Sequence, residues 1–332
     1  MAVLYLVEQG TVLRREGETL VVTREGVPLT RVPLLRLEQV VIYGNVQVTT
    51  PALEALLQRG IDTVFLTVEG RYYGRLVAPA SRFGELRLRQ LEHARDAERR
   101  LALARRFALG KLLNERTLLR RYARERALPA LEQAVEGLER SLRRVGRATH
   151  LGGVLAAEGH GTAQYFRAFR EVLRQDLGFV TRARRPPPDP VNALLSFGYT
   201  LLLHGVQAAV QVVGLDPHIG FLHAVVYSRP ALPLDLMEEF RPVIVDSVVL
   251  RLVNTGQVRA EHFRLGDKGG VYLGEEGKRR FVEQYEARLN TRVQHPRTGE
   301  QVTYRRCLEL QARQLARVLL GREAVYLPFV VR

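Results

Sequence analysis

The segment LRLRQLEHARDAERRLALARRFALGKLLNERTLLRRYARER (residues 86–126) decides the fold of this chain. Its apolar residues recur every three to four positions and arginine occupies the remaining faces, which is the pattern of amphipathic helices. The sequence after this segment keeps the helical period, whereas the sequence before it does not. We therefore predict a larger all-α domain over residues 85–332.

The sequence before this segment alternates with a period near two. It consists of short β-rich runs between glycine turns: AVLYLV (2–7), GETLVVTREG (17–26), LEQVVIYG (37–44), DTVFLTVEG (62–70) and RYYGRLV (71–77).

One predicted helix interrupts these strands, in TTPALEALLQRG (49–60). Thr50 suits the N-cap, Pro51 the first helical position and Gly60 the end of the helix. We predict an α+β fold in which a small N-terminal β domain with one helix occupies residues 1–84. This range includes a linker at VAPASRFGE (77–85).

The charge of the chain indicates its partner. Fifty basic and 35 acidic residues leave a net charge of +15, and Lys111, Lys268 and Lys278 are the only lysines, so 47 basic residues are arginine. The guanidinium group binds phosphate through two parallel hydrogen bonds. Codon bias or a thermophilic origin would explain the preference for arginine but not the excess of positive charge. We expect a polyanionic partner and, with nucleic acid, a steep salt dependence.

Cysteine content and hydropathy exclude other classes of protein. Cys307 is the single cysteine, so a disulfide framework and a cysteine-based zinc site are both excluded. Its helical spacing in TYRRCLELQARQL (303–315) predicts a small core residue. No segment approaches the roughly 20 uninterrupted apolar residues that span a bilayer, and MAVLYLVEQG (1–10) lacks signal-peptide features. We predict a cytoplasmic protein without a membrane partner.

Two neighbouring segments gather acidic groups around a histidine. GLDPHIGFLH (214–223) ends at His223, and PLDLMEEFRP (233–242) follows. Asp235 and Glu238 are three residues apart and share one helical face. An imidazole with two or three carboxylates suits Mg²⁺ or Mn²⁺, and a divalent ion of this kind serves phosphodiester chemistry.

The same segment also has a purely structural interpretation. We predict that the helix begins at Pro233 and that Glu239 points away from the shared face, toward Arg241 or solvent. Acids in a first helical turn commonly complement the helix dipole. A buried histidine is likewise usually a hydrogen-bonded core residue.

A third segment, GVLAAEGHGTAQYFRAFR (153–170), contains another acid beside small residues. Glu158 is followed by Gly159 and Gly161, so we expect it near a helix end where backbone can approach closely. Taken alone, such a glutamate also suits a solvated cap.

Four motifs occur in one order after the small β domain: EGHGTAQYF (158–166), DPVNALLSFGYTLL (189–202), GLDPHIGFLH (214–223) and LDLMEEFRP (234–242). In this combination the chain resembles the CRISPR-associated spacer-acquisition integrase family, namely its larger, metal-dependent subunit. The resemblance covers essentially the whole chain.

The resemblance implies a site residue by residue. Metal ligands fall on Glu158, His223 and Glu238, Asp235 is the neighbouring acid that supports the site, and Asn192 and Tyr165 fall near the active centre. His218 departs from the family, where many members carry an aromatic residue, and we expect a spacer or DNA contact there.

The resemblance also implies an activity. The implied enzyme is a Mg²⁺- or Mn²⁺-dependent DNA endonuclease and integrase of CRISPR adaptation that joins the 3′-hydroxyl ends of a short spacer duplex to repeat phosphodiesters. Such an enzyme also cuts or disintegrates branched DNA. The implied partners are double-stranded DNA, a second copy of the chain, and a small ferredoxin-like CRISPR-associated subunit. Two alternatives stay open from the residues: a non-catalytic DNA-binding scaffold and an RNA-processing nuclease.

Overall fold

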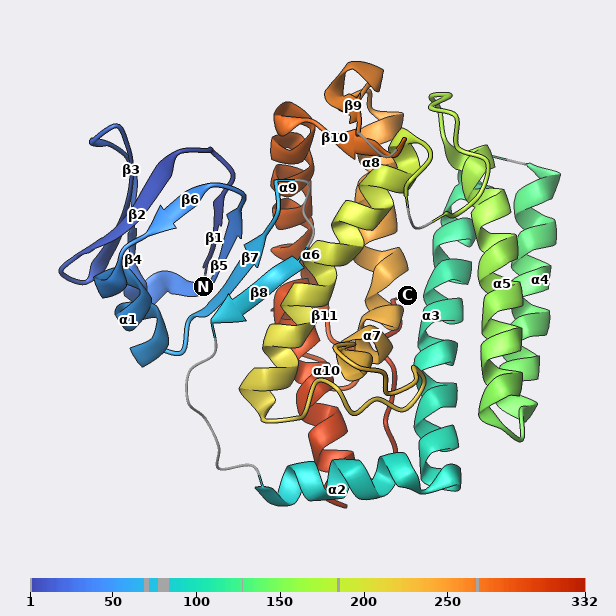
Figure 1. The fold of residues 1–332 in the computed structure, drawn as a ribbon. Coiled ribbons are helices and arrows are strands. Elements are labelled where there is room, and N and C mark those ends of the chain that lie inside the picture. The colour runs from blue at the N-terminus through green and yellow to red at the C-terminus, as the bar shows by residue number, and fades with distance from the viewer. Residues whose placement is uncertain are drawn as a thin grey trace. The chain divides into compact units, whose positions relative to one another are not determined.

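The computed structural model describes residues 2–68, 72–76, 84–126, 128–183, 186–266 and 269–331. The chain divides into two compact units, Met1–Ala80 and Ser81–Arg332 (Figure 1). Residues 77–83 of the predicted linker lie outside the described residues. Strands dominate the first unit and helices the second, which confirms the α+β fold class.

The first unit contains two four-stranded sheets. One is mixed, with the order β1-β5-β7-β8, in which only the β7–β8 pair is antiparallel. The other has the order β4-β3-β2-β6, in which only the β2–β6 pair is parallel. The strands are β1 (Ala2–Leu6), β2 (Thr11–Glu16), β3 (Thr19–Arg24), β4 (Val27–Pro33), β5 (Leu37–Tyr43), β6 (Val46–Val48), β7 (Asp62–Leu66) and β8 (Tyr72–Leu76).

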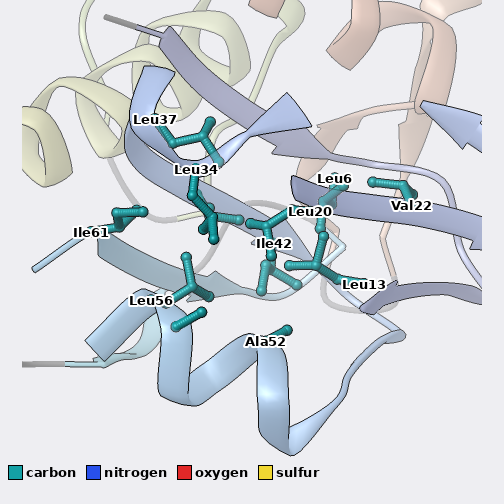
Figure 2. Close-up of a cluster of buried hydrophobic side chains, with 12 residues drawn as sticks. Leu6, Leu13, Leu20, Val22, Leu34, Leu37, Ile42, Ala52, Leu56 and Ile61 are labelled. Atoms are coloured by element: carbon teal, nitrogen blue, oxygen red, sulfur yellow. The ribbon is translucent and has the colours of Figure 1, made fainter. Parts of the chain in front are cut away.

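The core of this unit is aliphatic and includes the helix α1 (Thr50–Gln58). Leu13 and Leu20 from the strands and Leu56 from α1 are fully buried in it (Figure 2). We predicted Thr50 as the N-cap, but the N-cap is Thr49. Because proline needs no hydrogen-bond partner for its nitrogen in the first turn, the helix begins one residue earlier.

The arginine-rich segment at residues 86–126 folds as two helices. Asp96 interrupts the helical period and caps the second helix, since its carboxylate accepts hydrogen bonds from the backbone N–H groups of Glu98 and Arg99. This side-chain cap satisfies two of the donors that every helix start leaves open. The resulting helices are α2 (Gly84–Arg95) and α3 (Ala97–Glu125).

Helix α3 packs against α4 (Pro129–Arg147) and α5 (Leu151–Val172), which also pack on each other. Gly161 of α5 permits this approach, because a Cβ atom there would lie 2.7 Å from the Leu112 side chain and 3.0 Å from Ser141. The close backbone contact that we expected near Gly161 is therefore a helix–helix contact.

Helix α6 (Pro190–Val213) is the apolar core helix of the second unit. Asp189 caps it through the N–H of Asn192, and Gly214 ends it with φ 92°, as turn chemistry predicts. It is the one described helix long and apolar enough to cross a membrane, and 67% of its most apolar window is buried inside the protein. That burial is typical of a core helix in a soluble protein.

The segment after α6 contains the second pair of motifs. It forms α7 (Ala231–Met237), a 3-10 turn (Glu238–Phe240), a π-helical turn (Arg241–Asp246) and α8 (Ser247–Asn254). Helix α7 begins at Ala231, so our predicted start at Pro233 was two residues late. Pro233 lies in the first turn, where its missing N–H costs nothing. Such π-helical turns frequently occur at functional sites.

The rest of the second unit adds two small antiparallel hairpins that the periodicity did not predict. Cys307 is fully buried in the last helix, as predicted from its spacing. The elements are β9 (Phe263–Leu265), β10 (Val271–Leu273), α9 (Glu275–Leu289), β11 (Arg292–Gln294), β12 (Gln301–Thr303) and α10 (Tyr304–Leu319).

Candidate active site

A pocket of about 280 Å³ opens in the helical unit, and charged side chains from several elements line it. Helix α3 contributes Lys111 and Glu115, α5 contributes Glu158 and Thr162, α6 contributes Tyr199, and the π-helical turn contributes Arg241 and Asp246.

Two helices place their polar residues face to face. Lys111 and Glu115 on α3, like Glu158 and Thr162 on α5, are four residues apart and so share a helical face. The hydroxyl of Thr162 donates to Glu115 Oε1 at 3.1 Å and to Glu158 Oε1 at 3.2 Å. The Lys111 ammonium pairs with Glu158.

Glu158 lies in the middle of α5. Our prediction that it lies near a helix end was wrong. Glycines at positions 159 and 161 do not end this helix because its flanking turns pack on α3 and α4. Tertiary packing thus outweighs the weak helix propensity of glycine.

Glu238 lies at the centre of the charged groups. Its side chain is 4% exposed, and its Oε2 is 2.9 Å from the Lys111 Nζ. Its Oε1 is 3.2 Å from an Arg241 nitrogen and 3.9 Å from the His223 Nε2. The structure therefore brings Glu158 and Glu238 together on Lys111 and places His223 beside Glu238.

Asp235 is fully buried and orients His223. One carboxylate oxygen accepts the N–H of His223 at 2.8 Å and lies 2.7 Å from its Nδ1, while the other accepts the N–H groups of Phe221 and Leu222 at 2.5 and 2.9 Å. A carboxylate on one ring nitrogen directs the other nitrogen toward a ligand. Gly220 is required here, since a Cβ atom would lie 2.8 Å from Ala231.

A second buried acid, Asp246, lines the pocket. Asp246 accepts hydrogen bonds from the hydroxyl groups of Tyr165 at 2.7 Å and Tyr199 at 2.6 Å. Burial raises the pKa of Asp246 to about 6, and these two hydrogen bonds limit the rise. The Arg241 guanidinium lies over the Tyr199 ring, 4.8 Å from its centroid.

The charges around Lys111 shift one another's pKa values. Burial by itself lowers the pKa of Lys111, but Glu158 and Glu238 outweigh that effect and hold it above its usual value. Burial by itself raises the pKa of Glu238, but Arg241 and Lys111 hold it below its usual value. Glu115 has no comparable compensation, so burial raises its pKa well above the ordinary range.

Our prediction that Glu239 pairs with Arg241 or reaches solvent was wrong. Glu239 is fully buried and accepts hydrogen bonds from the Tyr326 hydroxyl at 2.6 Å, the Gln311 amide at 3.1 Å and the Phe329 N–H at 2.7 Å. The 3-10 turn rotates consecutive side chains apart, so Glu238 contacts Arg241 while Glu239 anchors the C-terminal segment.

The other residues implied by the resemblance occupy different places. Tyr165 reaches the pocket through its hydrogen bond to Asp246 and its ring contact with Phe166. Asn192 lies beneath the pocket rim, where its side chain binds the Thr181 carbonyl, the Arg182 guanidinium and the Ala183 N–H. His218 is exposed, and its expected role in DNA contact stays a prediction.

The donor set around Lys111 fits a divalent ion in its chemistry but not yet in its arrangement. Within the described residues, no three histidine, cysteine or acidic side chains are already arranged to hold a metal. The donors nevertheless converge on Lys111, and the buried Glu238 Oε2 accepts no well-oriented hydrogen bond although the Lys111 ammonium is close. Two carboxylates and an imidazole fit Mg²⁺ or Mn²⁺ chemically once that ammonium moves aside.

Sequence reasoning missed Lys111, Arg241 and Asp246. A usable signal existed for Lys111, since it is one of three lysines and falls within the apolar run FALGKLL (107–113). A lysine on the buried face of a helix needs an acidic partner.

Fold and site together define a two-unit α+β protein whose helical unit buries a cluster of acids and cations under arginine-rich helices. The family model described as "CRISPR associated protein Cas1" matches residues 4–287, and the chain belongs to that family.

Three known proteins illustrate the similarity. A protein of Thermus thermophilus named CRISPR-associated endonuclease Cas1 3 is 41% identical over 334 residues, covering 100% of this chain and 98% of its own. A structure titled as a casposase bound to integration product has the same fold, with a TM-score of 0.85, 24% identity, and coverage of 99% and 93%. A Cas6-RT-Cas1–Cas2 complex gives a TM-score of 0.83 and 26% identity, covering 99% of this chain and 36% of that chain.

Proposed function

We propose that this protein is a metal-dependent DNA endonuclease and integrase of CRISPR adaptation. It joins the 3′-hydroxyl ends of a short spacer duplex to repeat phosphodiesters and also cuts or disintegrates branched DNA. The contact of Glu158 and Glu238 with the same lysine, with His223 beside Glu238, carries this proposal. Membership in the Cas1 family and a relative named as an endonuclease support it.

Each site residue has a proposed role. Glu158, Glu238 and the His223 Nε2 hold Mg²⁺ or Mn²⁺, and Asp235 keeps the imidazole turned toward the site. A bound divalent ion supplies charge neutralisation at the phosphodiester and lowers the pKa of a coordinated hydroxyl group. Arg241, fixed against Tyr199, keeps a positive charge beside the pocket whatever the ligand.

An arginine stripe on α4 suits the DNA backbone. Arg140, Arg143, Arg144 and Arg147 have the spacing of one helical face and line a shallow hollow of about 410 Å³. In the described part of the chain, only Arg140 forms an ion pair, a loose one with Glu136 at 3.8 Å. Three arginines are thus available for phosphate groups.

Strand transfer tests the proposal. A short duplex with 3′-hydroxyl ends is incubated with a supercoiled repeat-containing plasmid, with Mg²⁺, Mn²⁺ or chelator. We expect metal-dependent joining by the wild type, none by Glu158→Ala, and wild-type joining by the control His160→Ala, whose side chain is exposed. Joining that survives in Glu158→Ala, or in chelator, would contradict the proposed site.

One observation favours the alternative of a non-catalytic DNA-binding scaffold. The acids of the pocket are already neutralised by Lys111 and Arg241 and form no ready metal cluster within the described residues. A thermal shift with Mn²⁺ separates the two functions, because a ligand that binds only the folded state stabilises it. A shift that persists in a Glu158, His223 and Glu238 triple alanine variant would favour the scaffold.

We also propose the surroundings of the activity. The protein acts in the cytoplasm on double-stranded DNA, as a homodimer, together with a small ferredoxin-like subunit. The Cas1–Cas2 complex among the similar structures supports the last partner. Joining that requires added small subunit would support it directly. Preference for branched RNA over a matched branched DNA would instead favour an RNA-processing nuclease.

A further inference from the structure

Lys111 is a buried cation enclosed by acids. Its side chain is 6% exposed, it pairs with Glu158, and its Nζ is 2.9 Å from Glu238 Oε2. Glu115 is one turn away on the same helix. These contacts join α3 to α5 and to the turn after α7, so a single ammonium bridges three separate elements.

Two cations of different mobility neutralise the carboxylates of Glu158 and Glu238. Arg241 contacts Glu238 at 3.2 Å and is also held over the Tyr199 ring, so its guanidinium is fixed from two sides. Within the described residues, Lys111 is held only by carboxylates, at the end of a flexible four-carbon chain. Of the two cations, Lys111 is therefore the one that can leave the carboxylates by rotating its side chain.

The backbone of α3 beside Lys111 is pinned. Gly110 packs so closely that a Cβ atom would lie 2.7 Å from Pro328 and 3.1 Å from Glu239. The Asn114 amide donates to the Glu239 carbonyl at 2.7 Å and to the Phe329 carbonyl at 2.8 Å. The helix cannot shift to relieve a new charge. Only the Lys111 side chain can move, and it borders a pocket with room for it.

We propose that Lys111 is a built-in counter-cation of the Glu158–Glu238 pair, and that Mg²⁺ or Mn²⁺ reaches these carboxylates only by displacing its ammonium group. This inference rests on the proposed metal site. The ammonium keeps the metal-free protein folded, because two buried carboxylates without a cation repel each other and lose their solvation. The same ammonium competes with the metal and thereby weakens its binding.

Removal of the ammonium tests both parts of this inference. Lys111→Met keeps the length of the side chain without the charge, and Lys111→Gln is a second variant with a polar end. Lys278→Met is the matched control, since Lys278 is equally buried but does not line the pocket. Binding of Mn²⁺ is measured by titration calorimetry, and thermal unfolding is measured in chelator and in saturating Mn²⁺.

We expect Lys111→Met to unfold at a lower temperature than the wild type in chelator and to recover most of that loss in Mn²⁺. Its dissociation constant for Mn²⁺ should fall at least about tenfold, because no charge-assisted contact must be broken first. Lys278→Met should bind Mn²⁺ like the wild type.

Equal or weaker Mn²⁺ binding by both Lys111 variants would overturn the proposal. So would variants that fail to fold even with Mn²⁺, since the metal would then not replace the ammonium. If neither wild type nor variants bind Mn²⁺, the proposed metal site itself fails, and displacement fails with it. A lower unfolding temperature in chelator would still identify Lys111 as the counter-cation in that case.

Discussion

Asp235→Asn isolates the hydrogen bonds that hold His223. The two aspartate oxygens accept three backbone N–H groups, one of the oxygens lies 2.7 Å from the His223 Nδ1, and the side chain is fully buried. Each oxygen faces two of these four nitrogen groups. When the asparagine NH₂ group faces Phe221 and Leu222, two backbone contacts are lost. When it faces His223, the backbone contact is lost, but Nδ1 accepts from the NH₂ group in the other imidazole tautomer.

The cost follows from these contacts. Hydrogen bonds to a charged acceptor contribute about 1.5–3 kcal/mol each, so losing one or two predicts a fall of about 1.5–6 kcal/mol in the free energy of unfolding. The variant should stay folded in water if the helical unit has the usual stability of about 5–15 kcal/mol. Metal affinity should fall about 10–100-fold, since the imidazole loses its supporting carboxylate.

Denaturant unfolding followed by circular dichroism measures the first quantity, and Mn²⁺ titration of the folded variant measures the second. Asp216→Asn is the matched control in the same loop. Asp216 is partly exposed and accepts one backbone N–H, from His218 at 2.8 Å. We expect the control to lose less than about 1 kcal/mol. Equal losses in the two variants would refute the reasoning, as would unchanged metal affinity in Asp235→Asn.

Three further predictions concern other parts of the second unit. Arg143→Ala with Arg147→Ala should lower the salt slope of duplex DNA binding, measured by fluorescence anisotropy, by about 2. Asp246→Asn should remove a pH dependence, because burial raises the pKa of Asp246 from 3.8 to about 6. Between these two pKa values the folded wild type binds more protons than the unfolded chain. Its free energy of unfolding therefore falls by up to about 3 kcal/mol as pH rises, which denaturant titrations at pH 4 and 7 would measure. Tyr326→Phe should cost about 1–3 kcal/mol in the same titrations, because the buried Glu239 loses a hydrogen-bond donor.

Each of these has a control or a contrary outcome. For the stripe on α4, the control is Arg306→Ala with Arg313→Ala, because both arginines are already paired with Glu309. Equal changes in salt slope would mean that general charge, and not the stripe, governs binding. An unaltered pH dependence in Asp246→Asn would assign that dependence to another group. No loss in Tyr326→Phe would show that water replaces the hydroxyl group.

Local sequence predicted what depends on neighbours along the chain. The change of period at residue 86 predicted the passage from strands to helices. Asp235 and Glu238 lie on adjoining turns, as their spacing indicates. The exact helix starts were less well predicted, because proline is accepted at more than one position of a first turn.

Long-range contacts were beyond the reach of periodicity. Glu158 was expected at a helix end because glycine lowers helix propensity, but packing on α3 and α4 keeps the helix continuous. Glu239 was expected to face Arg241 or solvent, and a segment near residue 329 turns it inward. Neither partner is close in sequence, so no local rule indicates them.

By itself the sequence determined the two-part α+β order, the arginine-rich helix surfaces and the candidate acids around His223, because spacing along a helix or strand specifies which residues share a face. Tertiary structure alone decided which faces meet. It placed Lys111 between Glu158, 47 residues later, and Glu238, and so turned separate acids into one balanced cluster. The physical reason is that Coulomb and hydrogen-bond interactions act over a few ångströms of space, whatever the separation along the chain.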